Sequence, residues 1–192
     1  PDIGGPYGPY RQTDRREIYH VHANTLVTSG HAYPCFCTPE RLELVRQEQQ
    51  KRKENPHYDG TCRMIAPEDA AGRVANGEKH IIRFKMPREG ATIAHDHLRG
   101  DIKTDNSQLN DYVLLKTDGL PTYHLAAMVD DHEMGITHVV RSSEWLGTFP
   151  LHVNIVRAFG WEEPIWIHLS VFLKPSGKGK MSKRDAADAI KD

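Results

Sequence analysis

Hydrophobic residues follow two different spacings along the chain, and each spacing predicts one kind of element. Apolar residues three and four positions apart predict helices over residues 13–29, 38–54, 67–76 and 151–159, and a further helix through Leu125, Met128 and Val129. Alternating or continuous apolar runs predict strands over residues 79–86, 137–140 and 165–173, with one or two more within residues 91–104. Helices and strands interleaved in this way predict an α/β protein.

Glycine and threonine mark where several of these elements begin and end. Thr13 and Thr38 are predicted N-caps, because a threonine hydroxyl can accept a hydrogen bond from a free backbone N–H in the first helical turn. Gly30 and Gly160 are predicted stops, since glycine readily adopts the left-handed conformation that ends a helix. An Asp-Gly pair at residues 118–119 predicts a tight turn between two short strands.

The stretch of residues 111–141 contains short strands, a helix and a strand that ends at Arg141. This order predicts a crossover within a parallel sheet, and such sheets place their ligands at the carboxyl ends of the strands. Arg141 is therefore a candidate ligand-binding residue. The later run IWIHLSVFL, residues 165–173, is almost continuously apolar and predicts a strand covered on both faces.

Composition narrows the class of protein. Of 192 residues, 38% are hydrophobic and 27% charged, as in a soluble globular domain, and no apolar run is long enough to span a membrane. With 25 basic and 26 acidic residues, the overall charge does not predict binding to nucleic acid. The basic segment of residues 46–53 is either a solvated helix face or a contact with an RNA backbone. Three cysteines without a secretory signal predict a reducing compartment.

Several short motifs occur in a fixed order. They are GGPYGPYRQ at residues 4–12, CFCTPERL at 35–42, YHLA at 123–126, VDDH at 129–132, MGITHVVR at 134–141, EWL at 144–146 and KMSKR at 180–184. Together they resemble glutamyl-tRNA synthetases, which are class I enzymes of translation, and KMSKR resembles the second signature loop of that class. The resemblance spans nearly the whole chain.

The resemblance implies the second half of a class I Rossmann-like nucleotide fold with an inserted α+β subdomain. Residues 1–29 would belong to the catalytic fold, 30–105 to an insertion that binds the tRNA acceptor end, 106–173 to the second half of the catalytic fold, and 174–192 to the signature loop and the start of the next segment. The first ATP-binding signature of the family does not occur. The chain is therefore expected to be an internal fragment of the catalytic region, inactive by itself.

The implied reaction is ATP-dependent ligation of L-glutamate to tRNA(Glu) through a glutamyl adenylate, with Mg²⁺ beside ATP. Glutamate, ATP and tRNA(Glu) are the implied partners, and we expect a cytoplasmic monomer of bacterial type, with an organellar version as the alternative. A paralogue that glutamylates a modified anticodon base, and a non-catalytic tRNA-binding module, remain alternative functions.

Site residues follow from the resemblance, position by position. Arg141 and Tyr123 would bind the glutamate side chain, since a guanidinium can hold a carboxylate with two hydrogen bonds. Lys183 and Lys180 would be catalytic, because lysines can meet the negative charge that develops during phosphoryl transfer. The implied ATP-binding residues are Lys180, Met181, Ser182, Lys183 and Arg184 of the loop together with Glu144 and Trp145.

Three positions depart from the family pattern. Ala127 stands where the family commonly has Asn, Ser142 where it has Gly or Ala, and Ser143 where it has Glu. The loss of an amide at position 127 removes a hydrogen-bonding group expected to face the amino acid, so these departures bear on affinity for glutamate.

The cysteines Cys35, Cys37 and Cys62 match the spacing of a zinc site found in some members of the family. Tyr58 is available as a fourth ligand, whereas the position two residues past the last cysteine, which could carry a histidine, is Met64. Without a clear fourth partner, the sequence favours buried free thiols over Zn²⁺.

Overall fold

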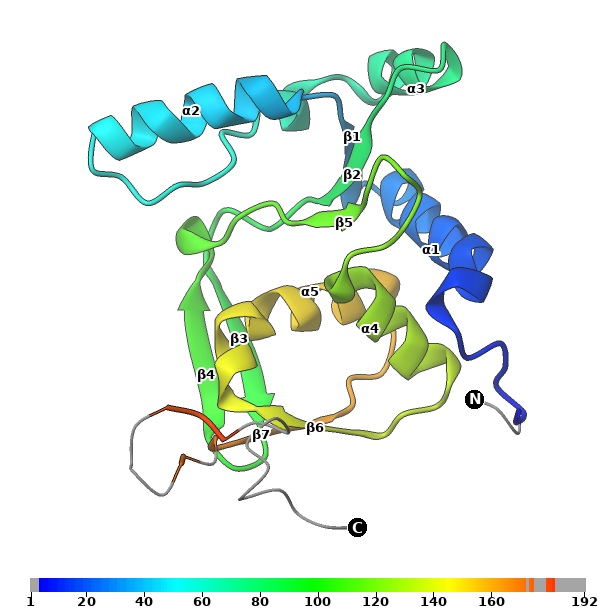
Figure 1. Cartoon of the computed structure of the whole chain (residues 1–192), viewed down its shortest axis with the longest axis vertical. Helices are drawn as coiled ribbons and strands as arrows, with labels where there is room; N and C mark the ends of the chain where they lie inside the picture. Colours follow the sequence, from blue (N-terminus) through cyan, green and yellow to red (C-terminus); the bar gives the residue numbers. More distant parts are fainter. Residues whose placement is uncertain (1–3, 172, 175–178, 182–192) are drawn as a thin grey trace.

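The computed structural model describes residues 4–171, 173–174 and 179–181 (Figure 1). The helices are α1 (Arg16–Thr28), α2 (Pro39–Lys51), α3 (Pro67–Ala75), α4 (Tyr123–Glu133) and α5 (Phe149–Phe159), with short 3-10 turns at Gln12–Arg15, Thr61–Met64, Asn106–Gln108 and Ser143–Thr148. The strands are β1 (Ala32–Cys35), β2 (Ile81–Phe84), β3 (Ala91–Asp96), β4 (Gly100–Asp105), β5 (Val113–Leu115), β6 (His138–Ser142) and β7 (Ile165–Leu169). Among the described residues, no helix combines the length and the apolar character needed to cross a membrane.

The strands form two sheets. One is antiparallel in the order β1-β2-β5, and the other has the order β4-β3-β7-β6, with β3 and β4 antiparallel and β6 parallel to β7. In Figure 1, α4 and α5 lie between the first sheet and the strands β6 and β7, while α2 extends away from the rest of the chain. This mixed α/β architecture confirms the predicted fold class. Strands β3 and β4 share a sheet with β6 and β7 although they lie within residues 30–105, and the domain division remains a prediction.

Local signals placed most helix ends correctly. The Thr38 hydroxyl accepts a hydrogen bond from the Arg41 backbone N–H, and α2 begins at Pro39 as expected, although it ends at Lys51 rather than near residue 54. Gly160 follows α5 with a φ of 69°, which is the left-handed stop that the sequence predicts. The predicted N-cap at Thr13 is wrong, because a 3-10 turn precedes α1 and no side chain caps that helix.

Two expectations about the strands need correction. The predicted crossover from β5 through α4 to β6 does not lie within one sheet, because β5 pairs with β2 in the other sheet; the parallel crossover is β6-α5-β7. The predicted turn at residues 118–119 is followed by a single bridge between Leu115 and Pro121 rather than a second strand. Strand β7 ends at Leu169, and only one of its faces is covered by described residues: Trp166 is buried, whereas Ile165 and Leu169 are 44% and 45% exposed.

One hydrophobic core contains residues of most elements, and part of it packs beside Arg141. Trp166 of β7, Phe149 and Ile155 of α5, Leu125 of α4 and Tyr19 of α1 are all almost completely buried within it. Full burial of a side chain of this size contributes about 1.5–3 kcal/mol to folding. The carboxyl end of β6 is therefore held by packing from α4, α5 and β7.

Candidate functional site

Arg141 lies near the carboxyl end of β6, directly opposite His168 of β7. Its Nε donates a hydrogen bond of 2.8 Å to Nε2 of His168, and its Nη1 donates one of 2.7 Å to Nδ1 of His152 on α5. The remaining terminal nitrogen, Nη2, is buried and has no hydrogen-bond partner. Because a buried unpaired donor costs free energy, this atom is the strongest indication of a ligand in the site.

Burial governs the protonation of the groups around Arg141. It lowers the pKa of Arg141, an effect that the nearby Tyr123 opposes. Burial together with the charge of Arg141 lowers the pKa of His152 to about 2, and burial also lowers the pKa of His168 despite its bond to Asp96. At neutral pH the site therefore contains one cationic guanidinium whose two imidazole partners are neutral.

Aromatic side chains form one wall beside this guanidinium. Tyr123, the first residue of α4, is 46% exposed and lies against Trp145, with 4.4 Å between the ring centroids. The same tyrosine makes an edge contact with His152 at 5.9 Å. Tyr123, Arg141 and Trp145, which the sequence assigned to glutamate and ATP binding, thus come together at one place.

Glu144 forms a second part of the predicted site. Its carboxylate pairs with the Lys180 ammonium group and accepts a 3.2 Å hydrogen bond from the Ser142 hydroxyl. Ser142 also caps the following 3-10 turn by accepting from the Glu144 backbone N–H. Lys180 lowers the pKa of Glu144. The structure therefore joins one lysine of the KMSKR motif to the end of β6.

Of the other residues of that motif, the structure describes only Met181. Met181 is described but takes part in none of these contacts, and Ser182, Lys183 and Arg184 lie outside the described residues. Their roles remain predictions.

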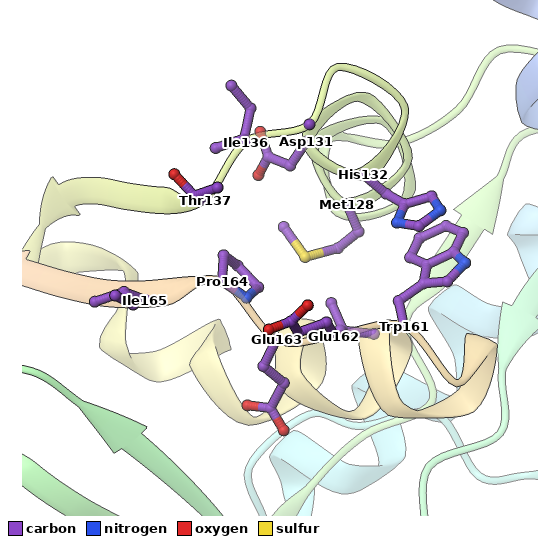
Figure 2. A pocket seen from close by; sticks show the side chains of 12 residues that line it. Met128, Asp131, His132, Ile136, Thr137, Trp161, Glu162, Glu163, Pro164 and Ile165 are labelled. Atoms are coloured by element: carbon purple, nitrogen blue, oxygen red, sulfur yellow. The ribbon is translucent and has the colours of Figure 1, made fainter.

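Asp130 and Asp131, near the end of α4, differ sharply in their surroundings. Asp130 pairs with Arg15 of the 3-10 turn before α1 at 2.7 Å and accepts a hydrogen bond from the Tyr19 hydroxyl of α1 at 2.9 Å, so its role is to join these two elements to α4. Burial and the charge of Asp130 raise the pKa of Asp131 to about 6. Asp131 lines a cavity of about 370 Å³ with Thr137 and other residues (Figure 2).

That cavity lies at the amino ends of β6 and β7, where Thr137 and Ile165 line it. Figure 2 shows the rings of His132 and Trp161 face to face at one side of it, and their centroids are 3.8 Å apart. Its lining includes no residue of the predicted site. It is therefore a separate feature of the fold.

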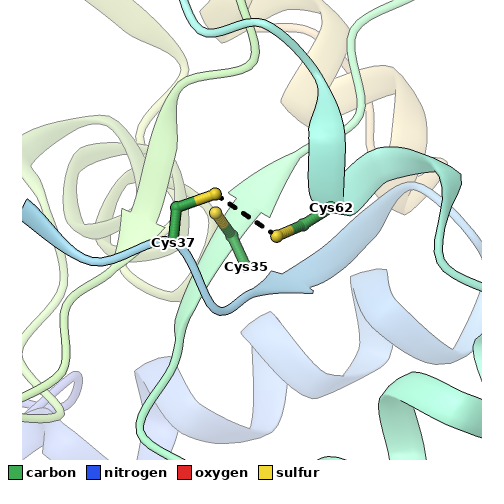
Figure 3. A group of neighbouring side chains, drawn as sticks. All are labelled: Cys35, Cys37 and Cys62. Atoms are coloured by element: carbon green, nitrogen blue, oxygen red, sulfur yellow. Dashed lines mark hydrogen bonds between the residues drawn. The ribbon is translucent and has the colours of Figure 1, made fainter. Parts of the chain in front are cut away.

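The thiol cluster lies in the other part of the molecule, between β1, α2 and a 3-10 turn. The sulfur atoms of Cys35, Cys37 and Cys62 all lie within 4.8 Å of one another (Figure 3). The Tyr58 hydroxyl is 3.4 Å from the sulfur of Cys35 and 3.5 Å from that of Cys37. Three thiol groups of the kind that bind zinc are thus gathered in one place, with the phenol oxygen of Tyr58 beside them at the position of a fourth partner.

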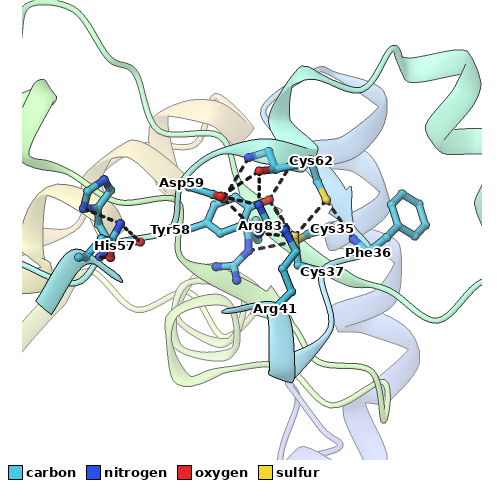
Figure 4. A network of polar contacts seen from close by, with 11 residues as sticks. Cys35, Phe36, Cys37, Arg41, His57, Tyr58, Asp59, Cys62 and Arg83 are labelled. Atoms are coloured by element: carbon cyan, nitrogen blue, oxygen red, sulfur yellow. Dashed lines mark hydrogen bonds and ion pairs between the residues drawn. The ribbon is translucent and has the colours of Figure 1, made fainter. Parts of the chain in front are cut away.

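Positive groups surround these sulfur atoms (Figure 4). Arg41 donates to the Cys37 sulfur at 3.4 Å and Arg83 to the Cys35 sulfur at 3.3 Å. Burial raises the pKa of Cys37 to about 11, whereas at Cys62 the hydrogen bonds outweigh burial and lower the pKa of the thiol. The lowered pKa of Cys62 favours its thiolate, which is the form that binds a metal ion. The donor set fits Zn²⁺, and the expectation of free thiols remains untested.

The sequence did not indicate the histidines around Arg141. His152 lies on the buried face of α5 and His168 in the apolar strand β7, where histidines resemble core residues. The available signal was a polar residue at a position whose neighbours are all apolar. The pairing of β6 with β7 brings His168 to Arg141, and the position of α5 brings His152 to the same arginine.

Known proteins match this chain over nearly its whole length. The model of the family "tRNA synthetases class I (E and Q), catalytic domain" matches residues 1–192. A glutamate--tRNA ligase of Fusobacterium nucleatum is 50% identical over 184 residues, which are 96% of this chain and 36% of that protein. A glutamate--tRNA ligase of Pseudomonas aeruginosa is 49% identical over 190 residues, covering 99% of this chain and 38% of that protein.

Solved structures agree with these matches. A glutamate-tRNA synthetase from Elizabethkingia anophelis superposes with a TM-score of 0.87 at 42% identity, over 97% of this chain and 39% of that one. A glutamate tRNA ligase from Elizabethkingia meningosepticum, solved in complex with its amino acid, gives a TM-score of 0.88 at 42% identity. The chain spans 36–39% of the length of these four relatives.

Proposed function

Because the chain belongs to the family of class I tRNA synthetases for glutamate and glutamine, we propose that it supplies the amino-acid pocket of an enzyme that ligates L-glutamate to tRNA(Glu). The observation that carries this proposal is the buried, unpartnered Nη2 of Arg141. A side-chain carboxylate of glutamate would satisfy that donor and the positive charge together. Tyr123, beside it, would complete the contact with the same side chain.

The reaction would run in two steps. The α-carboxylate of glutamate attacks the α-phosphorus of ATP, and pyrophosphate leaves; a hydroxyl of the terminal ribose of tRNA then attacks the carbonyl of the adenylate, and AMP leaves. Negative charge grows on the phosphate oxygens during the first step, so positioned cations lower its barrier. Lys180 and Lys183 would supply that charge, and Mg²⁺ would accompany ATP.

Glu144 has a specific place in this scheme. Its carboxylate holds Lys180 at the carboxyl end of β6, near Trp145 and the amino-acid pocket. An ion pair between two exposed side chains is weak, so the lysine can exchange it for a phosphate group when ATP binds. Trp145 would lie near the nucleotide.

The insertion would contact the tRNA acceptor end. Helix α2 extends away from the remaining structure, and its last turn carries Lys51 with Arg52 immediately after it (Figure 1). Cations on a projecting helix can replace the counterions of an RNA backbone. The thiol cluster at the base of this helix would hold Zn²⁺ through Cys35, Cys37, Cys62 and Tyr58, and the ion would supply a cross-link between β1 and the segment that follows α2.

The test is aminoacylation by the full-length product of the gene that encodes this chain, with and without Arg141→Ala. We expect the KM for glutamate to rise by about 30-fold or more, since truncation of a buried charge partner costs on the order of 2–5 kcal/mol. The KM for ATP should change little. Arg157→Ala is the matched control, because Arg157 is a half-exposed arginine that pairs with Glu163; its KM for glutamate should stay within about twofold.

An unchanged KM for glutamate in Arg141→Ala would refute the proposed role. If the protein instead bound acceptor-stem RNA with a steep salt dependence and catalysed no glutamate-dependent step, the non-catalytic module would be the correct function.

A further inference from the structure

Arg141 is the centre of a continuous series of hydrogen bonds that joins five elements, β3, β7, β6, α5 and α4. On one side it bonds to His168, whose Nδ1 lies 2.7 Å from Oδ2 of Asp96 at the end of β3. On the other side it bonds to His152, whose Nε2 lies 2.9 Å from Nδ1 of His124 on α4. Asp96, His152 and His168 are each at most 1% exposed. Most of the residues in this series of hydrogen bonds are therefore shielded from solvent.

Arg141 determines which atoms donate and which accept in this series of hydrogen bonds. A guanidinium only donates, so Nε2 of His168 and Nδ1 of His152 must both accept. His168 then carries its proton on Nδ1, and this N–H donates a hydrogen bond to Asp96. His152 carries its proton on Nε2, and this N–H donates a hydrogen bond to His124. Each histidine has one tautomer compatible with its partners, and in that tautomer it is neutral.

The His168 ring separates the carboxylate of Asp96 from the Arg141 guanidinium. Asp96 is fully buried, and hydrogen bonds from His168 and from the backbone N–H groups of Leu98 and Arg99 stabilise its charge. The imidazole of His168 lies between Asp96 and Arg141 and is hydrogen-bonded to both, so Asp96 does not contact the guanidinium. The guanidinium is consequently held by two neutral acceptors, and Nη2 is left for a ligand.

We propose that His152 and His168 are positioning residues that fix the Arg141 guanidinium as neutral acceptors and so set the affinity for the side-chain carboxylate of glutamate. This inference rests on the proposed function. Neither histidine touches the substrate; each acts through Arg141. Rotation of the guanidinium away from β7 would misplace the donor atoms, and a bidentate contact is sensitive to that geometry.

Substitution by asparagine or glutamine tests both histidines, and the amide that keeps the acceptor for Arg141 differs between positions 152 and 168. In a side chain of asparagine the amide oxygen can occupy the place of Nδ1, and in glutamine it can occupy the place of Nε2. His152→Asn and His168→Gln therefore keep the acceptor for Arg141, whereas His152→Gln and His168→Asn lose it. We expect the acceptor-losing variant at each position to raise the KM for glutamate about tenfold, as for loss of a hydrogen bond to a charged group. The acceptor-keeping variant should raise it less than about threefold, with the KM for ATP unchanged in all four.

Equal increases in KM for the two amides at both positions would overturn the inference, because a role in packing alone does not depend on which atom accepts. The two histidines lie on different elements, so a variant that fails to fold at one position leaves the comparison at the other intact. Arg141→Ala, measured in the same assay, separates the outcomes. If it leaves the KM for glutamate unchanged, the proposed function fails; if it raises the KM while the paired amides do not differ, only the positioning role fails.

Discussion

Asp111 is the residue whose removal should most damage the fold around the thiol cluster. Its carboxylate is completely buried and accepts hydrogen bonds from the Tyr33 hydroxyl at 2.6 Å, from Arg63 at 2.9 Å and from the Met86 backbone N–H at 3.0 Å, and Arg88 lies 3.3 Å away. These partners belong to β1, to the 3-10 turn at Thr61–Met64 and to the segment after β2. A single side chain thus ties three separate segments to the start of β5.

The expected cost of Asp111→Ala follows from what it leaves behind. Arg63 is only 17% exposed, so it would keep a largely buried charge without its partner, and the breaking of a buried ion pair typically costs about 3–5 kcal/mol. Asp111→Asn retains the shape and one acceptor, and should cost about 1–3 kcal/mol. Tyr33→Phe removes one hydrogen bond to the charged carboxylate and should cost about 1.5–3 kcal/mol. For a domain with a total stability of about 5–15 kcal/mol, the first change is severe.

Urea unfolding followed by circular dichroism measures these differences, with the slope of the transition as a check that the unfolded state is unchanged. Glu54→Ala is the matched control, because Glu54 is a carboxylate that is 44% exposed and pairs with Arg52; it should cost under about 1 kcal/mol. Combining Asp111→Asn with Tyr33→Phe should give a coupling energy of about 0.5 kcal/mol or more. A loss of less than about 1 kcal/mol for Asp111→Ala at unchanged slope would refute the reasoning.

Two further predictions concern other ionisable groups. Since burial and Asp130 raise the pKa of Asp131 to about 6 from 3.8, the native chain holds that proton more tightly than the unfolded chain, and stability falls as pH rises from about 4 through 6. Asp131→Asn should therefore stabilise by about 1–2 kcal/mol at pH 8 after a discount for solvent, and give no gain below pH 4; equal gains in urea unfolding at both pH values would contradict this. The purified chain should carry about one equivalent of zinc by elemental analysis, and Cys62→Ala should lose it while the neighbouring His57→Ala retains it; a metal-free wild-type protein would show that the thiols are free.

The sequence predicted the ends of elements better than their partners, for a physical reason. A cap or a stop depends on a few adjacent residues, so Pro39 and Gly160 were sufficient to locate the start of α2 and the end of α5. Sheet membership depends on contacts between distant residues. Strand β3 joins β7 through Asp96 and Trp166, and β5 joins β2 instead of β6. No spacing along the chain specifies either pairing.

The same distinction applies to the candidate site. Tyr123, Arg141 and Trp145 could be named from motifs, because each lies within a short recognisable segment. His152 and His168 could not, because each is a single polar residue among apolar ones. His168 acquires its role only when β7 pairs with β6, and His152 only when α5 packs beside Arg141. Asp111 was missed for a similar reason, since its partners come from segments up to 78 residues away.

The use of histidines beside Arg141 has an electrostatic consequence. A carboxylate at position 168 would accept from the guanidinium equally well, but its charge would neutralise Arg141 and compete with the carboxylate of the substrate. A neutral imidazole accepts without that competition and donates its own N–H in a hydrogen bond to Asp96, 2.7 Å away. In a buried site, where the interaction between charges is stronger than in water, an arginine held in this way keeps most of its attraction for an incoming anion. In the free protein this arrangement leaves Arg141 with a lowered pKa and leaves its Nη2 without a hydrogen-bond partner. A bound carboxylate would raise that pKa and accept a hydrogen bond from Nη2.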